Sequence, residues 1–178
     1  MPIGGGPAGR RLSDQDQPCS VCDPTSVEEV KIQIKRVRHR NDAVSLPTYM
    51  TEGAAGMDLF ADLEEEVALS PLERVLIPTG IAVALPRGFE AQIRPRSGLA
   101  LKEGVTLANS PGTIDSDYRG EIQVIAVNLG NHPVVIQRGQ RLAQMVVQRV
   151  CRAQWQEVQE LPPSERQERV FGHTDKKS

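Results

Sequence analysis

The segment Ser110–Glu121 gathers residue types that can carry out chemistry. It reads Ser-Pro-Gly-Thr-Ile-Asp-Ser-Asp-Tyr-Arg-Gly-Glu and lies between two apolar segments. A chain reversal needs only Gly, Pro, Asn or Asp, whereas this segment also holds an aromatic ring, an arginine and further carboxylates. Asp115 is a candidate general base, because a carboxylate fixed beside a reacting group can accept its proton. Taken alone, the segment is explained equally well as a polar hairpin loop.

Three other segments place small residues beside charged or polar ones where apolar stretches end. Arg96 is followed by Ser97 and Gly98, an order that suits an anion, because guanidinium binds phosphate with two prongs, serine adds a hydroxyl and glycine admits the backbone. A surface arginine beside a helix cap is the alternative interpretation. The three segments are Ala54–Ala61, with Asp58 at its centre, Arg94–Ala100 and Gly139–Met145.

Short apolar runs separated by turn residues must position these segments. From Val30 onward, apolar and polar residues alternate, which predicts a half-buried first strand. Many short strands at such spacing predict an all-β sandwich or barrel, and only Ser97–Glu103 has room for a short helix. Further strands are expected at Val67–Leu69, Arg74–Ile77, Ile81–Leu85, Glu90–Ile93, Val105–Leu107, Ile122–Asn128, Val134–Ile136 and Leu142–Val150.

The ends of the chain differ from its centre in composition. Gln154–Val158 is expected to form a last strand, with Trp155 as a packing anchor, and the chain turns polar after Leu161-Pro162-Pro163. We therefore expect a flexible N-terminal tail over residues 1–27, one β domain over residues 28–161 and a mobile C-terminal arm over residues 162–178.

Composition narrows the class of protein. The 178 residues include 21 basic and 23 acidic side chains, so neither a nucleic acid nor a membrane is an expected partner. Aromatic residues make up only 3%, which predicts an aliphatic core and favours oligomerisation. The three cysteines, and the absence of a long apolar stretch or an apolar N-terminal block, favour a cytoplasmic, soluble protein. Cys19 and Cys22 have the spacing of half a zinc site, but a second ligand pair at suitable spacing is missing, which disfavours zinc.

Taken in order and spacing, the four segments resemble the motifs of the homotrimeric dUTP nucleotidohydrolase (dUTPase) family, from about Val30 to Thr174. A single Ala-Gly-x-Asp would mean little, whereas four motifs in order are specific. The matching residues are Ala55-Gly-Met-Asp-Leu59, Pro95-Arg-Ser-Gly-Leu-Ala100, Gly112-Thr-Ile-Asp-Ser-Asp-Tyr-Arg-Gly120 and Gly139-Gln-Arg-Leu-Ala-Gln144.

The resemblance implies a jelly-roll-like β-barrel, a homotrimer with shared active sites, and hydrolysis of dUTP to dUMP and pyrophosphate. Such an enzyme limits uracil in DNA and supplies dUMP for thymidylate synthesis. Asp115 aligns with the general base that activates water for attack on the α-phosphorus. The cofactor implied is Mg²⁺, held by the phosphates and water. No direct protein ligand is expected, and Asp58 acts only in the outer shell.

The same resemblance assigns the substrate contacts. Backbone groups around Asn109 and Gln123 read the uracil edge, and Tyr118 packs under the deoxyribose and leaves no space for a 2′-hydroxyl. Without the resemblance, an ordinary strand tyrosine is the favoured interpretation of Tyr118. Thr113 and Ile114 are further expected contacts in the hairpin. The phosphate contacts are expected from Arg96, Ser97, Gly98 and Gln144.

The C-terminal motif departs from the family pattern, which is an Arg followed by a Gly-rich stretch. A residue other than glycine adopts positive φ only at a cost of about 1 kcal/mol or more, so we expect the arm to close less well and turnover to be slow or binding loose. Non-glycine residues stand at Gln167, Arg169, Val170 and Asp175, while expected substrate contacts remain at Arg166, Phe171, Gly172, His173 and Thr174.

Two other functions stay open. A dCTP deaminase of the same fold attacks the base rather than the phosphate, although Ile114–Tyr118 favours the hydrolase. A nucleotide-binding regulatory module would keep the pocket and lose turnover through the altered arm. A purely structural jelly roll has no use for Asp115 and Tyr118.

Overall fold

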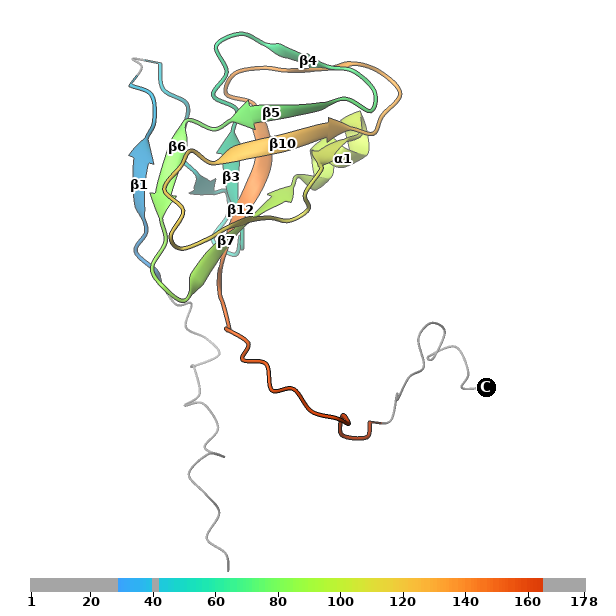
Figure 1. Cartoon of the computed structure of the whole chain (residues 1–178). Coiled ribbons are helices and arrows are strands. Elements are labelled where there is room, and N and C mark those ends of the chain that lie inside the picture. The colour runs from blue at the N-terminus through green and yellow to red at the C-terminus, as the bar shows by residue number, and fades with distance from the viewer. Residues whose placement is uncertain (1–28, 40–41, 165–178) are drawn as a thin grey trace, which may run out of the picture.

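The structure is a computed structural model that describes residues 29–39 and 42–164. Over these residues the chain folds into strands with one short helix at one end (Figure 1). The elements are β1 (Gln33–Arg36), β2 (Thr48–Tyr49), β3 (Met57–Phe60), β4 (Val67–Leu69), β5 (Arg74–Pro78), β6 (Ile81–Ala84), β7 (Phe89–Pro95), α1 (Ser97–Glu103), β8 (Val105–Leu107), β9 (Gly112–Ile114), β10 (Gln123–Asn128), β11 (Val134–Ile136) and β12 (Arg141–Arg149).

The strands pair across long stretches of sequence. The largest sheet has the order β2-β3-β12-β7-β9, the next has β5-β10-β8, and two ribbons pair β11 with β4 and β1 with β6. Every pairing is antiparallel. β12 lies between β3 and β7, and β10 lies between β5 and β8, so apart from β2 and β3 the paired strands are not neighbours in sequence. This confirms the predicted all-β, jelly-roll-like fold.

An aliphatic core lies between the sheets. Along β10, Val124, Ala126 and Asn128 are buried while Gln123 and Ile125 are exposed, as the period-2 alternation of a strand requires. Among the described residues, the buried core cluster contains no aromatic side chain. Each fully buried Leu or Ile contributes roughly 1.5–3 kcal/mol, so many aliphatic residues together replace the large rings that the sequence lacks.

The single helix has the bounds that the sequence predicts. Arg96 is its N-cap with extended backbone angles, and Gly104 ends it in the left-handed conformation at φ 70°. A Cβ at Gly104 would come within 2.4 Å of the Gly130 backbone nitrogen, so glycine is needed there for space as well as for φ. The helix therefore starts directly after a predicted phosphate contact and places Ser97 and Gly98 in its first turn.

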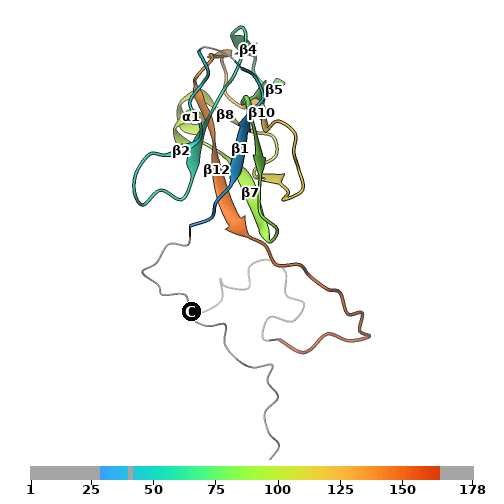
Figure 2. The same ribbon diagram turned by 90° about the vertical axis from the view of Figure 1, so that its left-hand side faces the viewer.

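The two ends of the domain differ in how well they follow the expectation. The first strand is present but begins at Gln33, three residues after Val30, and Val30 and Ile32 are half-buried as expected while Ile34 is 40% exposed. The expected last strand is wrong. Gln154–Val158 forms no strand, and Trp155 is 95% exposed rather than a packing anchor. After β12 the chain leaves the barrel, as the orange-red segment in Figure 2 shows, so these residues have no neighbouring strand to pair with.

Candidate active site

Six of the predicted site residues line one cavity of about 270 Å³, called here the hairpin cavity. It lies where the edge strand β9 of the larger sheet passes into β10 of the smaller one. Leu76, Ile93, Leu107, Val124 and Ile125 supply apolar walls from four different strands. The six predicted residues are Asn109, Thr113, Ile114, Asp115, Tyr118 and Gln123.

A tight turn presents Asp115 at the mouth of this cavity. Its backbone carbonyl accepts a hydrogen bond of 3.1 Å from the Tyr118 amide, which closes the turn. The Asp115 residue is exposed, and no side chain or amide in the described part of the chain donates to its carboxylate. The carboxylate is therefore held by the turn at its backbone and is open to a reactant at its side chain.

Tyr118 is fixed by the residues that follow it. Its hydroxyl donates a hydrogen bond of 2.9 Å to the backbone carbonyl of Glu121. The phenol also lies directly against Gly120, where an added Cβ would overlap the Tyr118 hydroxyl. The ring is still 43% exposed and lines the hairpin cavity. Hydrogen bonding and close packing thus define the position of the ring before any substrate binds.

Glycine at position 112 shapes the wall of the hairpin cavity beside Asn109. A Cβ there would come within 2.9 Å of the Asn109 side-chain nitrogen and 3.7 Å of the Ile93 Cβ. Gly112 pairs with Ile93 of β7, at the start of β9. The absence of a side chain at Gly112 therefore lets Asn109 approach the strand and stay in the cavity wall.

Other predicted contacts gather at a second cavity, of about 390 Å³, called here the basic cavity. Arg96 and Gly98 line it, and Ser97 is exposed between them at the start of α1. Sequence reasoning did not single out two of its basic residues, Lys102 and Arg141. The sequence does contain features that could have identified them, because Arg141 belongs to the fourth motif and Lys102 follows Arg96 by less than two helical turns. The remaining lining residues are Leu99, Glu103 and Gln140.

A buried carboxylate organises the basic cavity. Asp58 on β3 is 2% exposed, and its Oδ1 lies 3.2 Å from the Arg96 Nε. Its Oδ2 lies 3.3 Å from the Arg141 Nη1, and the Gln144 side-chain amide approaches Oδ1 at 3.4 Å. Asp58 pairs across strands with Gln144, so the sheet register itself brings these groups together. One negative charge thus orients two guanidinium groups and leaves an excess of positive charge.

The two cavities are separated along β7. Ile114, beside Asp115, pairs with Ala91, while Arg96 follows Ala91 by five positions. At about 3.3 Å per residue along a strand, this spacing amounts to about 17 Å. Within one chain, Asp115 and Arg96 therefore belong to different cavities at different levels along β7.

Metal binding has no dedicated protein cage in the part of the chain that the structure describes, because no three His, Cys, Asp or Glu side chains gather there. Both carboxylate oxygens of Asp58 are engaged by Arg96, Arg141 and Gln144. The outer-shell role expected for Asp58 towards Mg²⁺ stays a prediction.

Several predicted positions lie outside the described residues. They are Cys19, Cys22, Arg166, Phe171, Gly172, His173 and Thr174. Across residues 29–39 and 42–164, the structure has no helix with the length and apolar character needed to cross a membrane.

Comparison with known proteins agrees with the fold and with the motifs. Residues 42–175 match the family model described as dUTPase. The deoxyuridine 5′-triphosphate nucleotidohydrolase of Caldanaerobacter subterraneus subsp. tengcongensis is 58% identical over 145 residues, which cover 82% of this chain and 97% of that protein. The protein of the same name from Fusobacterium nucleatum is 51% identical over 146 residues, covering 82% and 99%.

Solved structures give the same result. The dUTPase of Staphylococcus bacteriophage 80alpha with bound dUPNHPP aligns with a TM-score of 0.71 and 25% identity, over 80% of this chain and 96% of that chain. The dUTPase of S. aureus phage phi11, in a structure concerned with a structural Mg(II) ion, has the same fold with a TM-score of 0.65 and 22% identity, over 74% and 98%. By family match, sequence identity and fold, this chain belongs to the dUTPase family.

Proposed function

We propose that this chain hydrolyses dUTP to dUMP and pyrophosphate, with Asp115 as the general base. The observation that carries the proposal is the joint position of Asp115 and Tyr118 at one cavity with apolar walls. Relatives that are 58% and 51% identical are named as dUTP nucleotidohydrolases, which supports the same substrate here. In the cell, this reaction limits uracil in DNA and supplies dUMP for thymidylate synthesis, and we propose that it takes place in the cytoplasm.

The hairpin cavity is suited to the deoxyuridine part of the substrate. Apolar walls from β5, β7, β8 and β10 favour a neutral base over a charged group. Backbone groups near Asn109 and Gln123 would read the uracil edge, and an acceptor facing its N3–H would reject cytosine, whose N3 is an acceptor. Thr113 and Ile114 complete the contact from β9. The Tyr118 ring would occupy the space that a 2′-hydroxyl needs.

The reaction follows from an exposed carboxylate beside the bound nucleotide. Asp115 accepts a proton from water while the water oxygen bonds to the α-phosphorus. The bond from that phosphorus to the oxygen bridging towards the β-phosphate breaks, and pyrophosphate leaves. Arg96 and Arg141 offset the negative charge, with Ser97, Gly98 and Gln144 as further phosphate contacts. When bound, Mg²⁺ supplies positive charge to the phosphates, which together with water would be its ligands.

We propose that a complete site uses a second copy of the chain. Within one chain, Ile114, the neighbour of Asp115, and Arg96 lie about 17 Å apart along the strands, which is farther than one phosphate group spans. This separation supports the expected homotrimer, in which the hairpin cavity of one copy faces the basic cavity of another. We propose that the C-terminal arm, from which Phe171 would cover the uracil, closes over this shared site less well than a Gly-rich arm.

Pyrophosphate release from dUTP with Mg²⁺ tests the proposal. Asp115→Asn removes the base and is expected to lower kcat by about 10²–10⁴-fold. Asp117→Asn is the matched control, because Asp117 belongs to the same turn but does not line the cavity, and it should retain the wild-type rate. Equal rates in wild type and Asp115→Asn would reject Asp115 as the base.

The same assay separates the two other functions. Release of ammonia from dCTP would identify a deaminase. Tight dUTP binding without pyrophosphate release would identify a regulatory module. This outcome is worth testing because Arg169 and Val170 stand at positions where the family pattern has glycine.

A further inference from the structure

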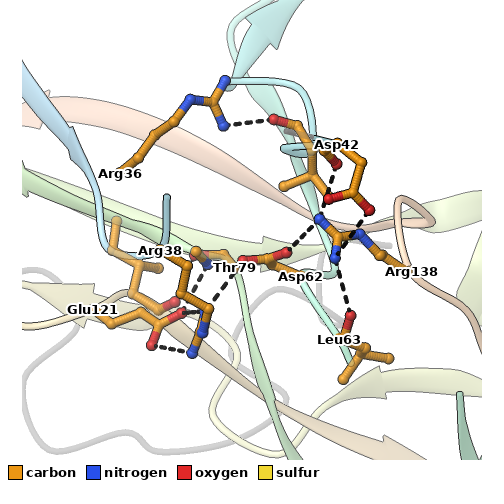
Figure 3. A network of polar contacts seen from close by, with 11 residues as sticks. Arg36, Arg38, Asp42, Asp62, Leu63, Thr79, Glu121 and Arg138 are labelled. Carbon is orange, nitrogen blue, oxygen red and sulfur yellow. Dashed lines mark hydrogen bonds and ion pairs between the residues drawn. The ribbon is translucent and has the colours of Figure 1, made fainter. Parts of the chain in front are cut away.

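Arg38 lies outside all four motifs, yet it contacts the end of the catalytic hairpin. It follows β1 and joins a row of alternating charges formed by Glu121, Arg38, Asp62, Arg138 and Asp42. Figure 3 shows this row, with Glu121 at one end and Asp42 at the other. Arg38 and Glu121 are 83 residues apart in sequence. The row thus connects the start of the domain to the hairpin that carries Asp115 and Tyr118.

The contact between Arg38 and Glu121 is two-pronged. Arg38 Nη1 lies 2.7 Å from Glu121 Oε1, and Nη2 lies 2.9 Å from Oε2. The Glu121 side chain is only 14% exposed, and the Gly80 amide also donates to its Oε1 at 2.7 Å. The hydrogen bond with Glu121 raises the pKa of Arg38 above its ordinary value, so the guanidinium stays charged at any working pH. Glu121 therefore has one orientation, fixed on both oxygens.

The backbone of the same glutamate holds the tyrosine. The Tyr118 hydroxyl donates to the Glu121 carbonyl at 2.9 Å. The next residue, Ile122, is tied down as well, because its carbonyl accepts a 2.6 Å hydrogen bond from the Thr79 hydroxyl. The side chain of Glu121 is thus anchored by Arg38 while its carbonyl anchors the phenol. A shift of Glu121 would move the acceptor on which the Tyr118 ring depends.

We propose that Arg38 is a positioning residue for sugar discrimination, acting through Glu121 to hold Tyr118 where it excludes a ribose. This inference rests on the proposed function, in which Tyr118 packs under the deoxyribose. Loss of Arg38 leaves the mostly buried Glu121 carboxylate without its counter-charge, and the carboxylate then turns towards water. The Glu121 carbonyl moves with it, and the tyrosine ring gains room for a 2′-hydroxyl. Lysine restores the charge but not the two-pronged geometry.

The other end of the row supplies an internal control. Arg138 lies 3.1 Å from Asp62 Oδ1, as an ion pair without hydrogen-bond geometry, and donates to the carbonyl of Asp42 at 2.9 Å. Among the described residues, Arg138 makes polar contacts with Asp42, Asp62 and Leu63, and it does not line the hairpin cavity. Arg138→Gln therefore removes the same kind of charge from the same network while leaving Tyr118 in place. If Arg38 only stabilised the fold, Arg38→Gln and Arg138→Gln would have the same effect on sugar discrimination.

The test is the ratio of kcat/KM for dUTP to kcat/KM for UTP. Arg38→Gln should lower this ratio about tenfold, with Arg38→Lys in between and Arg138→Gln at the wild-type ratio, although both Gln variants melt at lower temperature. Glu121→Gln, which keeps the shape but loses the charge, should also lower the ratio and keeps the test available if Arg38→Gln fails to fold. An unchanged ratio in folded Arg38→Lys and Glu121→Gln would overturn the inference.

Measurements of nucleotide binding distinguish a failure of this inference from a failure of the proposed function. The Kd ratio of UMP to dUMP needs no turnover, so it reports on Arg38 even if the wild type fails to release pyrophosphate. Absence of pyrophosphate release would reject the proposed function. A wild-type Kd ratio that persists in the Arg38 variants would reject the positioning role alone.

Discussion

The hairpin cavity and the basic cavity are built in different ways although one strand, β7, connects them. In the hairpin cavity, turns and glycines of a single segment set the shape, and apolar strand residues form the walls. In the basic cavity, the buried carboxylate of Asp58 on β3 gathers Arg96 from the start of α1 and Arg141 and Gln144 from β12. Shape discriminates between neutral bases and sugars, whereas charge attracts phosphates of any nucleotide. On the proposed function, specificity and affinity therefore belong to separate regions of the chain.

Mixing two impaired variants, one altered in each cavity, gives the largest expected effect. Asp115→Asn destroys the chemistry of the hairpin cavity, and Arg96→Gln weakens the basic cavity. If different copies supply the two cavities, assembly from an equal mixture gives about one quarter of sites with both intact. Pyrophosphate release by the co-refolded mixture should therefore reach about a quarter of the wild-type rate, far above either variant alone.

A different result from the mixture would contradict the shared-site proposal. If the mixture shows only the average of the two variants, each chain uses its own two cavities, and the shared-site proposal is wrong. Mixing after folding, without exchange of subunits, is the control and should give no recovery.

Asp58→Asn should have the next largest effect, on affinity rather than on base selection. It leaves two guanidinium groups without their shared counter-charge, so the free energy of unfolding should fall by about 2–4 kcal/mol. The KM for dUTP should rise about 10–100-fold because Arg96 and Arg141 lose their orientation. The preference for dUTP over dCTP should persist, since the hairpin cavity is untouched. Urea unfolding and steady-state kinetics measure the two effects.

Asp62→Asn is the matched variant for Asp58→Asn. Asp62 is also buried and also contacts two arginines, Arg38 and Arg138, but neither arginine lines the basic cavity. It should lose comparable stability and keep its KM for dUTP. A similar rise of KM in both variants would show that general destabilisation, and not the orientation of Arg96, controls affinity.

The sequence predicts those parts of the fold that depend on local pattern. Strands β4, β8 and β11 and the helix Ser97–Glu103 have the predicted bounds, because short apolar runs between turn residues have few alternatives. Strands β2, β3 and β9 are missed. β2 and β9 hold only two or three residues each, and β3 lies in the segment Ala54–Ala61, for which the sequence predicts a loop with Asp58 at its centre. Gly112–Ile114, for example, is a strand only because β7 lies beside it.

The site shows the same limit. Motif spacing identifies Asp115, Tyr118 and Arg96, since each lies in a segment of unusual composition. Nothing in the local sequence links Arg38 to Glu121, because their contact depends on how strands far apart in sequence assemble. Polar partners at long range are therefore what the structure adds to the motifs.

Gly120→Ala should affect discrimination within the hairpin cavity. A Cβ at this position would overlap the Tyr118 hydroxyl, so the ring must shift and its hydrogen bond to Glu121 weakens. We expect the ratio of kcat/KM for dUTP to that for UTP to fall about fivefold, corresponding to about 1 kcal/mol. Gly53→Ala is the control, because nothing lies within 4 Å of an added Cβ there. An unchanged ratio in Gly120→Ala would mean that the ring has room to adapt.

Lys102→Gln should have the smallest effect, confined to the basic cavity. Lys102 is exposed on α1, and an exposed charge contributes only about 0.2–1 kcal/mol. The KM for dUTP should therefore rise about two- to threefold at low salt, and the difference from wild type should vanish near 1 M salt, where screening is nearly complete. Lys35→Gln on β1, outside both cavities, should leave KM unchanged. A change in the ratio of kcat/KM for dUTP to kcat/KM for UTP with Lys102→Gln would contradict the division of roles, in which the hairpin cavity selects the nucleoside and the basic cavity attracts the phosphates.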